Sequence, residues 1–149
     1  MRHVAVSGFC FRVGLGPFEQ AAVVADAGFE QSPPRPGHGL RSVTKRGSGK
    51  RHVTPVYAHE VLCSDIHDKR MAPFITKILA HSLKEFPHLI SHEGEEFFYV
   101  LDGEVVIYTD LYEPLKLTAG DSMYFDTSMG HATVSSGDKD ATVLWVHCM

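Results

Sequence analysis

The stretch that decides the fold runs from Ser91 to Gly103 and reads Ser-His-Glu-Gly-Glu-Glu-Phe-Phe-Tyr-Val-Leu-Asp-Gly. His92 and Glu96 stand four residues apart, just before an apolar run that ends at Asp102-Gly103. Because side chains alternate along a strand, residues four apart lie on the same face. The stretch therefore predicts a strand with an imidazole and a carboxylate on one side, followed by a hairpin turn at Asp-Gly.

Short strands with regular turn signals extend over most of the chain. We predict strands at Val53–Leu62, Pro73–His81, Phe97–Leu101, Glu104–Thr109, Pro114–Thr118, Ser122–Phe125, His131–Ser135 and Ala141–His147. Gly-Asp, Asp-Gly and Ser-Gly-Asp turns separate the later strands, and no helical stretch intervenes. This spacing is typical of an all-β sandwich or barrel.

The N-terminal region has a different composition. Residues 18–28 are good helix formers that end at Gly28, which predicts one short helix. Residues 31–39 contain three Pro and two Gly, which is typical of a linker. We therefore predict an N-terminal extension at 1–39, with at most one helix, and a single β-barrel domain at 40–149.

The composition is that of an ordinary soluble protein, with 44% hydrophobic and 21% charged residues. The three cysteines show no paired spacing, which argues against a disulfide framework and fits a reducing cytoplasm. No apolar run approaches the roughly 20 residues that span a bilayer, and no clear signal peptide begins the chain. We expect a cytoplasmic protein without a membrane partner.

Charge is distributed unevenly along the chain. Residues 40–90 hold nine Lys and Arg against four Asp and Glu, whereas residues 91–149 hold two against eleven. Five of the positive charges lie between Arg41 and Arg51, around a Gly-Ser-Gly sequence. Such a cluster can bind an anionic ligand or nucleic acid, but its composition favours a solvated turn. No aromatic residue interleaves the charges, so base stacking is not supported.

The sequence from His92 to Gly103, together with Gly120-Asp-Ser-Met-Tyr-Phe and His131, resembles the paired motifs of the cupin superfamily. Within this superfamily, the sequence is most similar to the C-terminal sensor domain of bacterial XRE-type helix-turn-helix transcriptional regulators. The strings that carry this likeness are Gly-Glu-Glu-Phe-Phe-Tyr-Val-Leu-Asp-Gly-Glu, Tyr-Phe-Asp-Thr-Ser-Met-Gly-His, Ala-Thr-Val-Leu-Trp-Val and Arg-Ser-Val-Thr-Lys-Arg. The resemblance implies a double-stranded β-helix, the jelly-roll cupin barrel, that binds a small molecule and forms a homodimer. No helix-turn-helix is recognisable in residues 1–39, so we predict no DNA binding by this chain alone.

The resemblance also implies a metal site, because many cupins hold a divalent ion with three His and one Glu. Carried over residue by residue, His92 matches the second His, Glu96 the Glu and His131 the last His. Ile90 stands where the first His is expected. His88 would lie about 13 Å from His92 along a strand, at about 3.3 Å per residue, so we do not expect it to substitute.

The chemistry of the three remaining ligands leaves two alternatives open. Two imidazoles and one carboxylate can hold Fe(II) or Zn(II) with open coordination positions, and Ni(II) and Mn(II) are further candidates. Without a metal, the same groups would form a polar cluster that binds a small ligand or pairs internally. In either case, the walls of the ligand pocket are predicted to include Phe98, Tyr108, Met123 and Tyr124.

The absence of one metal ligand favours a sensor-type domain over an enzyme. We expect a small-molecule-binding cupin domain linked to transcriptional regulation. The alternative is a cupin metalloenzyme of the dioxygenase, isomerase or hydrolase type that uses His92, Glu96 and His131. No catalytic residue is assigned, because the sequence identifies neither a general base nor a substrate.

Overall fold

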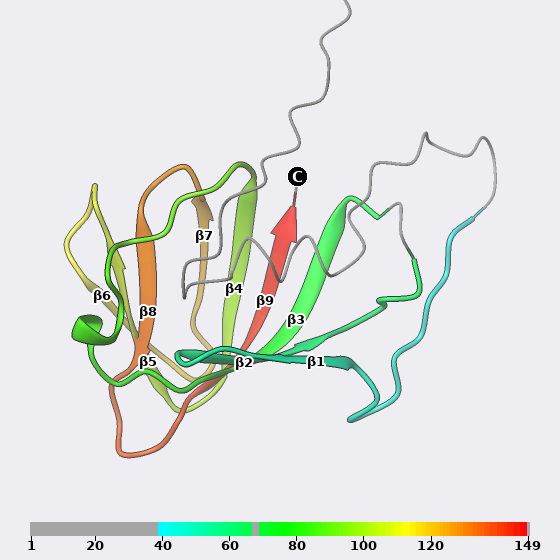
Figure 1. Cartoon of the computed structure of the whole chain (residues 1–149), viewed down its shortest axis with the longest axis horizontal. Helices are drawn as coiled ribbons and strands as arrows, with labels where there is room; N and C mark the ends of the chain where they lie inside the picture. Colours follow the sequence, from blue (N-terminus) through cyan, green and yellow to red (C-terminus); the bar gives the residue numbers. More distant parts are fainter. Residues whose placement is uncertain (1–38, 67–68, 149) are drawn as a thin grey trace, which may run out of the picture.

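The computed structural model describes residues 39–66 and 69–148, which fold into two antiparallel sheets (Figure 1). Its elements are β1 (Lys50–Val53), β2 (Tyr57–Val61), β3 (Met71–Ile78), the 3₁₀ turn η1 (Leu83–Glu85), β4 (Glu95–Asp102), β5 (Glu104–Thr109), β6 (Leu115–Thr118), β7 (Ser122–Asp126), β8 (His131–Ser135) and β9 (Thr142–Cys148). Apart from η1, the described ranges contain no helix. The predicted helix at 18–28 and nearly all of the predicted linker lie outside them.

The two sheets form the walls of a jelly-roll barrel, as the sequence predicts. The larger sheet has the order β1-β2-β3-β9-β4-β7, and the smaller one has the order β6-β5-β8. Figure 1 shows β5, β6 and β8 on one side and β3, β4 and β9 on the other. The Tyr57 hydroxyl links the sheets, because it donates to Thr133 O at 3.2 Å and accepts from Thr133 N at 3.1 Å.

Most predicted strands agree with the structure, and β5 and β8 have the predicted bounds. Within the predicted strand Val53–Leu62, Val53 is the last residue of β1 and Tyr57–Val61 forms β2; the two strands pair as a hairpin. The Thr54 hydroxyl accepts a hydrogen bond from Tyr57 N at 3.0 Å and so closes the turn between them. Pro55 within this turn has no N–H to donate to a strand ladder.

The turn at Asp102-Gly103 is present, but its predicted role as a hairpin is wrong. β4 and β5 belong to different sheets, so the turn carries the chain from one wall of the barrel to the other. A register shift between Val100 and Asp102 interrupts the pairing with β9 just before the turn. Gly103 then adopts a φ of +81°, which side chains disfavour.

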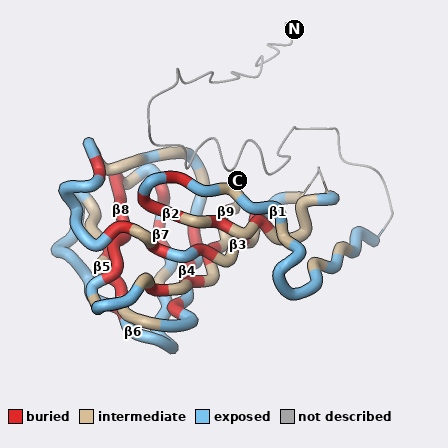
Figure 2. The backbone as a smooth tube through the Cα atoms, turned by 60° about the horizontal axis from the view of Figure 1, so that its bottom comes forward, coloured by how far each residue is buried: buried red, intermediate tan, exposed pale blue. Residues whose placement is uncertain are grey.

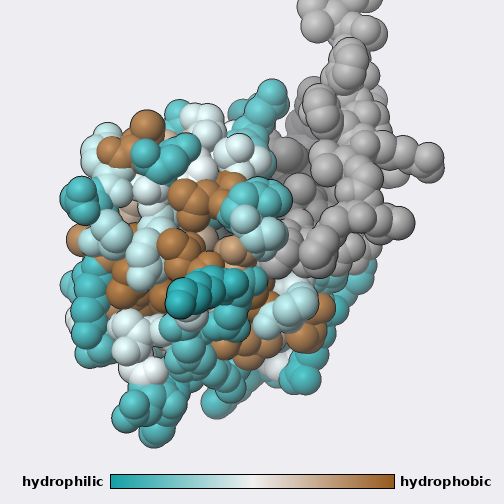
Figure 3. Space-filling view, turned by 60° about the vertical axis from the view of Figure 1, so that its left-hand side comes forward, coloured by the Kyte–Doolittle hydropathy of each residue, from teal (hydrophilic) through white to brown (hydrophobic). Residues whose placement is uncertain are grey.

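Alternation along β4 places the site inside the barrel. Glu96, Phe98 and Val100 are buried, whereas the intervening Phe97 and Leu101 are 40% and 46% exposed. Figure 2 shows the buried positions along the inner strands of both sheets. The side of the molecule that carries β5, β6 and β8 presents scattered hydrophobic surface (Figure 3).

The basic segment from Arg41 to Arg51, whose last two residues begin β1, is exposed at its charged positions. Its turn is closed by a hydrogen bond from Ser48 N to Lys45 O at 3.0 Å, and the charged side chains on either side reach solvent. None of the helices in the described part of the chain has the length and apolar character needed to cross a membrane.

Candidate metal centre

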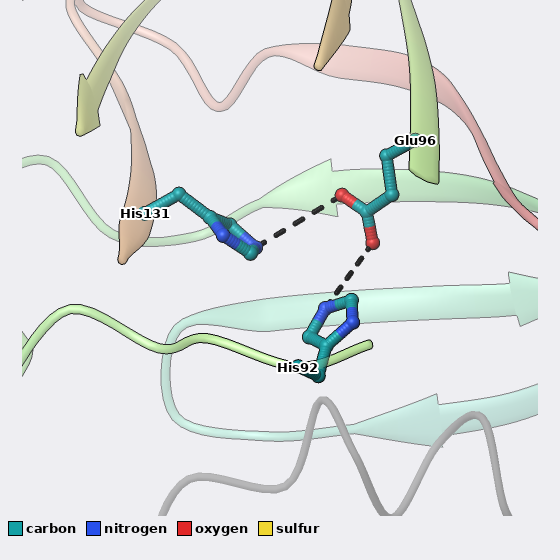
Figure 4. Close-up of side chains that lie close together, drawn as sticks. All are labelled: His92, Glu96 and His131. Carbon is teal, nitrogen blue, oxygen red and sulfur yellow. Dashed lines mark ion pairs between the residues drawn. The ribbon is translucent and has the colours of Figure 1, made fainter. Parts of the chain in front are cut away.

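Two residues from the two sheets and one from the loop before β4 meet in the barrel (Figure 4). Glu96 lies on β4, His131 begins β8, and His92 precedes β4. His92 Nε2 lies 3.4 Å from Glu96 Oε1, and His131 Nε2 lies 4.0 Å from Glu96 Oε2. One ligand atom from each residue lies within 4.8 Å of the others. The structure therefore brings together the three predicted metal ligands.

Backbone hydrogen bonds position the segment that carries His92. Ile90 N donates to His131 O at 3.0 Å, and His131 N donates to Ile90 O at 2.8 Å. His92 N donates to Thr127 O at 2.9 Å. These bonds attach the segment before β4 to β8 and to the loop between β7 and β8. As a result, two histidines 39 positions apart in sequence face the same carboxylate.

Each histidine is oriented by a backbone carbonyl. His131 Nδ1 lies 2.9 Å from Met129 O, and His92 Nδ1 lies 3.2 Å from Glu93 O. Because a carbonyl oxygen only accepts, each neutral ring carries its proton on Nδ1 and turns the lone pair of Nε2 toward Glu96. Metal-binding histidines typically show this arrangement.

The fit of a cation is clearest at His131. Its Nε2 is buried and has no hydrogen-bond partner among the described residues. It faces a carboxylate oxygen, so two acceptors lie opposite each other. Leaving a buried polar atom unpaired costs about 1–3 kcal/mol. A cation between Nε2 and the carboxylate would satisfy both, so the donor set fits a metal ion.

Two side chains of β9 contact the Glu96 carboxylate. Trp145 Nε1 donates a short hydrogen bond to Oε2, and His147 Nδ1 lies 3.5 Å from Oε1. The strand register explains this arrangement, because Glu96 pairs with His147 and Phe98 pairs with Trp145. Neither of these β9 residues was predicted to belong to the site.

Electrostatics keep the carboxylate ionised. Burial alone would raise the pKa of Glu96, but the side chains of His147, His92 and His131 lower it to about 2. Burial likewise opposes the charged form of His92, yet the hydrogen bond and the charge of Glu96 raise its pKa overall. Burial lowers the pKa of His131 despite the attraction of Glu96.

The predicted pocket residues divide between two faces. Phe98 is fully buried against Trp145, with ring centroids 5.2 Å apart, and Met123 is its partner on β7. Tyr124 is 64% exposed and pairs with the outward-facing Phe97, so it does not line the interior.

Tyr108 is also on the face away from the site. It pairs with Ala132, one position along from the pair of Thr109 with His131. Because neighbouring positions alternate in direction, Tyr108 and His131 lie on opposite faces of the smaller sheet. A residue that was not predicted, Phe125, instead lies near the site, with its ring 5.1 Å from that of His131.

A further buried histidine, His59, lies on β2 outside the candidate ligand group. Its Nδ1 is 2.8 Å from the Thr76 hydroxyl, and its ring centroid is 6.4 Å from that of His52. Burial, with a smaller contribution from His52, lowers the pKa of His59 to about 4.

The neutral state of His59 predicts a pH dependence of stability. Between pH 6.5 and about 4 the unfolded chain binds more protons at this residue, so its contribution is complete above pH 6.5 and falls as the pH falls. Between pH 7 and 4.5 the wild type should lose roughly 2 kcal/mol more unfolding free energy than His59→Gln. Urea unfolding at both pH values measures this, and equal losses would contradict it.

The fold and the site together define a small β-barrel with a candidate centre of two histidines and one glutamate. Residues 80–147 match the family model described as a cupin domain, so this chain contains a cupin domain. No curated protein is significantly similar to the chain in sequence.

Several solved structures share this fold. Iron(II) HppE is 20% identical with a TM-score of 0.63, and the match covers 76% of this chain and 65% of that chain. Hydroxypropylphosphonic acid epoxidase from S. wedmorenis is 20% identical with a TM-score of 0.61, covering 72% and 59%. Its complex with fosfomycin is 20% identical with a TM-score of 0.60, covering 82% and 64%. The chain thus spans less than two thirds of the length of these proteins. At this identity, the likeness establishes the fold alone.

Proposed function

We propose that this cupin domain binds a divalent transition-metal ion through His92, Glu96 and His131, together with a small-molecule ligand. The observation that carries the proposal is the convergence of two carbonyl-oriented imidazoles on one ionised carboxylate. Two nitrogens and an oxygen suit Zn(II), Fe(II), Ni(II) or Mn(II). Iron and cobalt forms of HppE have the same fold.

The residues around the centre would determine how a ligand binds. One carboxylate with neutral imidazoles leaves a divalent ion with a net positive charge, which favours an anionic or polar ligand. The ion would supply Lewis acidity and open positions for oxygen or nitrogen donors. Phe98 and Phe125 are buried beside the ligands and restrict water, and Trp145 fixes one carboxylate oxygen.

Sensing and catalysis are the two uses of such a centre. The sensor role, with its link to transcriptional regulation, rests on the resemblance in sequence. The second candidate, a metalloenzyme, is supported by the open positions that three protein ligands leave and by the epoxidase activity named for a protein of similar fold. Conversion of a bound ligand under turnover conditions would favour the enzyme, whereas binding without conversion would favour the sensor.

Metal binding itself is tested on the purified full chain. Elemental analysis should find about one divalent ion per chain after reconstitution, and His59→Gln, which changes a buried histidine outside the candidate ligand group, should retain it. A ligand at 100 times its dissociation constant should then stabilise the loaded protein by about 2.7 kcal/mol in a thermal-shift screen. If no divalent transition metal binds, the proposal fails.

We also propose that the chain pairs with a second copy through the outer face of the larger sheet. Phe97 lies between Tyr124 and Val146 on neighbouring strands, and Tyr99 lies beside Leu144, so apolar side chains follow one another across β7, β4 and β9. Contiguous apolar surface of this kind is typical of interaction sites.

The pairing predicts a strong effect of a charge on this face. Tyr99→Glu should weaken self-association by at least about tenfold, because a charge buried without a partner in an interface is costly. Sedimentation velocity across a concentration series measures it. Leu115→Glu, an exposed position on the smaller sheet, is the matched control. A monomeric wild type, or equal effects of both variants, would exclude this face.

A further inference from the structure

The cupin motif expects a histidine two positions before His92, where this chain has Ile90. Ile90 forms a two-way backbone pair with His131, so its position is fixed beside the centre even though its side chain cannot bind metal. A four-ligand set would therefore need a histidine from another element. The strand next to β4 supplies one at its inward-facing end, His147.

Nδ1 of His147 lies at a suitable distance from Glu96 to share a metal ion with it. This atom lies 3.5 Å from Glu96 Oε1, almost the same separation as the 3.4 Å from His92 Nε2 to that oxygen. Two ligand atoms bound tetrahedrally to one ion at about 2.1 Å are about 3.4 Å apart. The rings of His147 and His92 are also in contact, with centroids 4.9 Å apart.

Apart from its contact with Glu96, the same atom has no partner among the described residues. Nδ1 of His147 is buried, and none of the described residues forms a hydrogen bond with it. Trp145 donates to the other carboxylate oxygen of Glu96. A buried imidazole nitrogen that faces an ionised carboxylate beside two candidate ligands is suited to bind the same cation.

A backbone position without a side chain accommodates this ring. A Cβ at Gly94 would lie 2.8 Å from His147 Cε1 and 3.2 Å from its Nε2. Gly94 belongs to the segment between His92 and Glu96, so the ligand-bearing sequence itself leaves room for the ring from β9. With Nδ1 bound to a metal, the ring would carry its proton on Nε2, at the edge that Gly94 leaves open.

We propose that His147 is the fourth protein ligand of the metal centre and replaces the histidine absent at position 90. The inference rests on the proposed function, because it assumes that the centre binds metal. It changes the donor set from two imidazoles and a carboxylate to three imidazoles and a carboxylate. Fewer open positions then remain for a ligand than in a three-residue site.

The number of bound imidazoles tests the proposal directly. Pulsed EPR of the full chain loaded with one equivalent of Cu(II) should count three imidazoles in the wild type. His147→Gln and His92→Gln should each show two, and His59→Gln should show three. His147→Gln should also weaken Zn(II) binding by roughly 10- to 100-fold, measured by competition with a chelator.

The outcomes separate this inference from the proposed function. Two imidazoles in the wild type, unchanged in His147→Gln, would show that His147 is not a ligand even if its substitution weakened binding. A wild-type count of two would by itself exclude the four-ligand set, without reference to the folding of any variant. If the wild type bound no divalent metal at all, the proposed function would fail together with this inference.

Discussion

Glu96→Gln is expected to lower the affinity for divalent metal ions by more than about 100-fold, because loss of an outer partner alone typically costs 10- to 100-fold. Glu96 supplies the only negative charge within the candidate ligand group, and both candidate imidazoles point toward it. Glutamine preserves the shape and an amide oxygen that can accept the hydrogen bond from Trp145. The fold should therefore persist while metal binding is lost.

Zn(II) competition titrations and thermal unfolding measure this loss. An ion concentration that stabilises the wild type by about 2.7 kcal/mol should stabilise the variant by only about 0.4 kcal/mol if its dissociation constant rises 100-fold. Glu95→Gln is the matched control, because its side chain is exposed on the opposite face of β4. His131→Ala should lose metal like Glu96→Gln. Unchanged affinity in either site variant would place any bound metal elsewhere.

Gly94→Ala is expected to destabilise the protein by about 2–4 kcal/mol, through backbone strain and overpacking together. Gly94 has a φ of +109°, which residues with a Cβ rarely adopt. Its Cβ would also lie 2.3 Å from Cys148 O and 2.8 Å from His147 Cε1. Cys148 belongs to β9, which is paired on both sides, so the carbonyl cannot easily move away.

A second glycine separates the two causes. Gly120 has a φ of +97°, but a Cβ there would meet no atom within 4 Å. Gly120→Ala should therefore show the backbone strain alone, of the order of 1–3 kcal/mol. Urea unfolding of both variants in the presence of a chelator gives the difference due to crowding against β9. Equal losses of stability in Gly94→Ala and Gly120→Ala would show that β9 moves to accommodate the added methyl group.

The sequence predicted the features that depend on local patterns. Alternation along residues 95–102 is visible without a structure, and it correctly placed Glu96 on the buried side of β4. The spacing of His92 and Glu96 lies within one segment, so the family motif could identify both residues. His131 was predicted because it stands eleven residues after Gly120, as the second cupin motif requires.

Features that depend on strand pairing could not be predicted in the same way. His147 reaches Glu96 only because β9 lies next to β4 in one particular register. No local pattern in the sequence encodes that neighbour. Tyr124 was assigned to the wrong face for a related reason, since a shift of one position reverses the direction of a side chain. The Asp102-Gly103 sequence likewise encoded a turn but not the sheet that follows it.

The position of Trp145 gives the protein an internal optical probe. It is the single tryptophan of the chain, and its indole nitrogen donates a hydrogen bond to the Glu96 carboxylate of the candidate centre. Its fluorescence therefore arises one hydrogen bond from the site. Occupation of the site by an ion or a ligand can be followed in the unlabelled protein, on the timescale of a stopped-flow experiment, against a background free of other indoles.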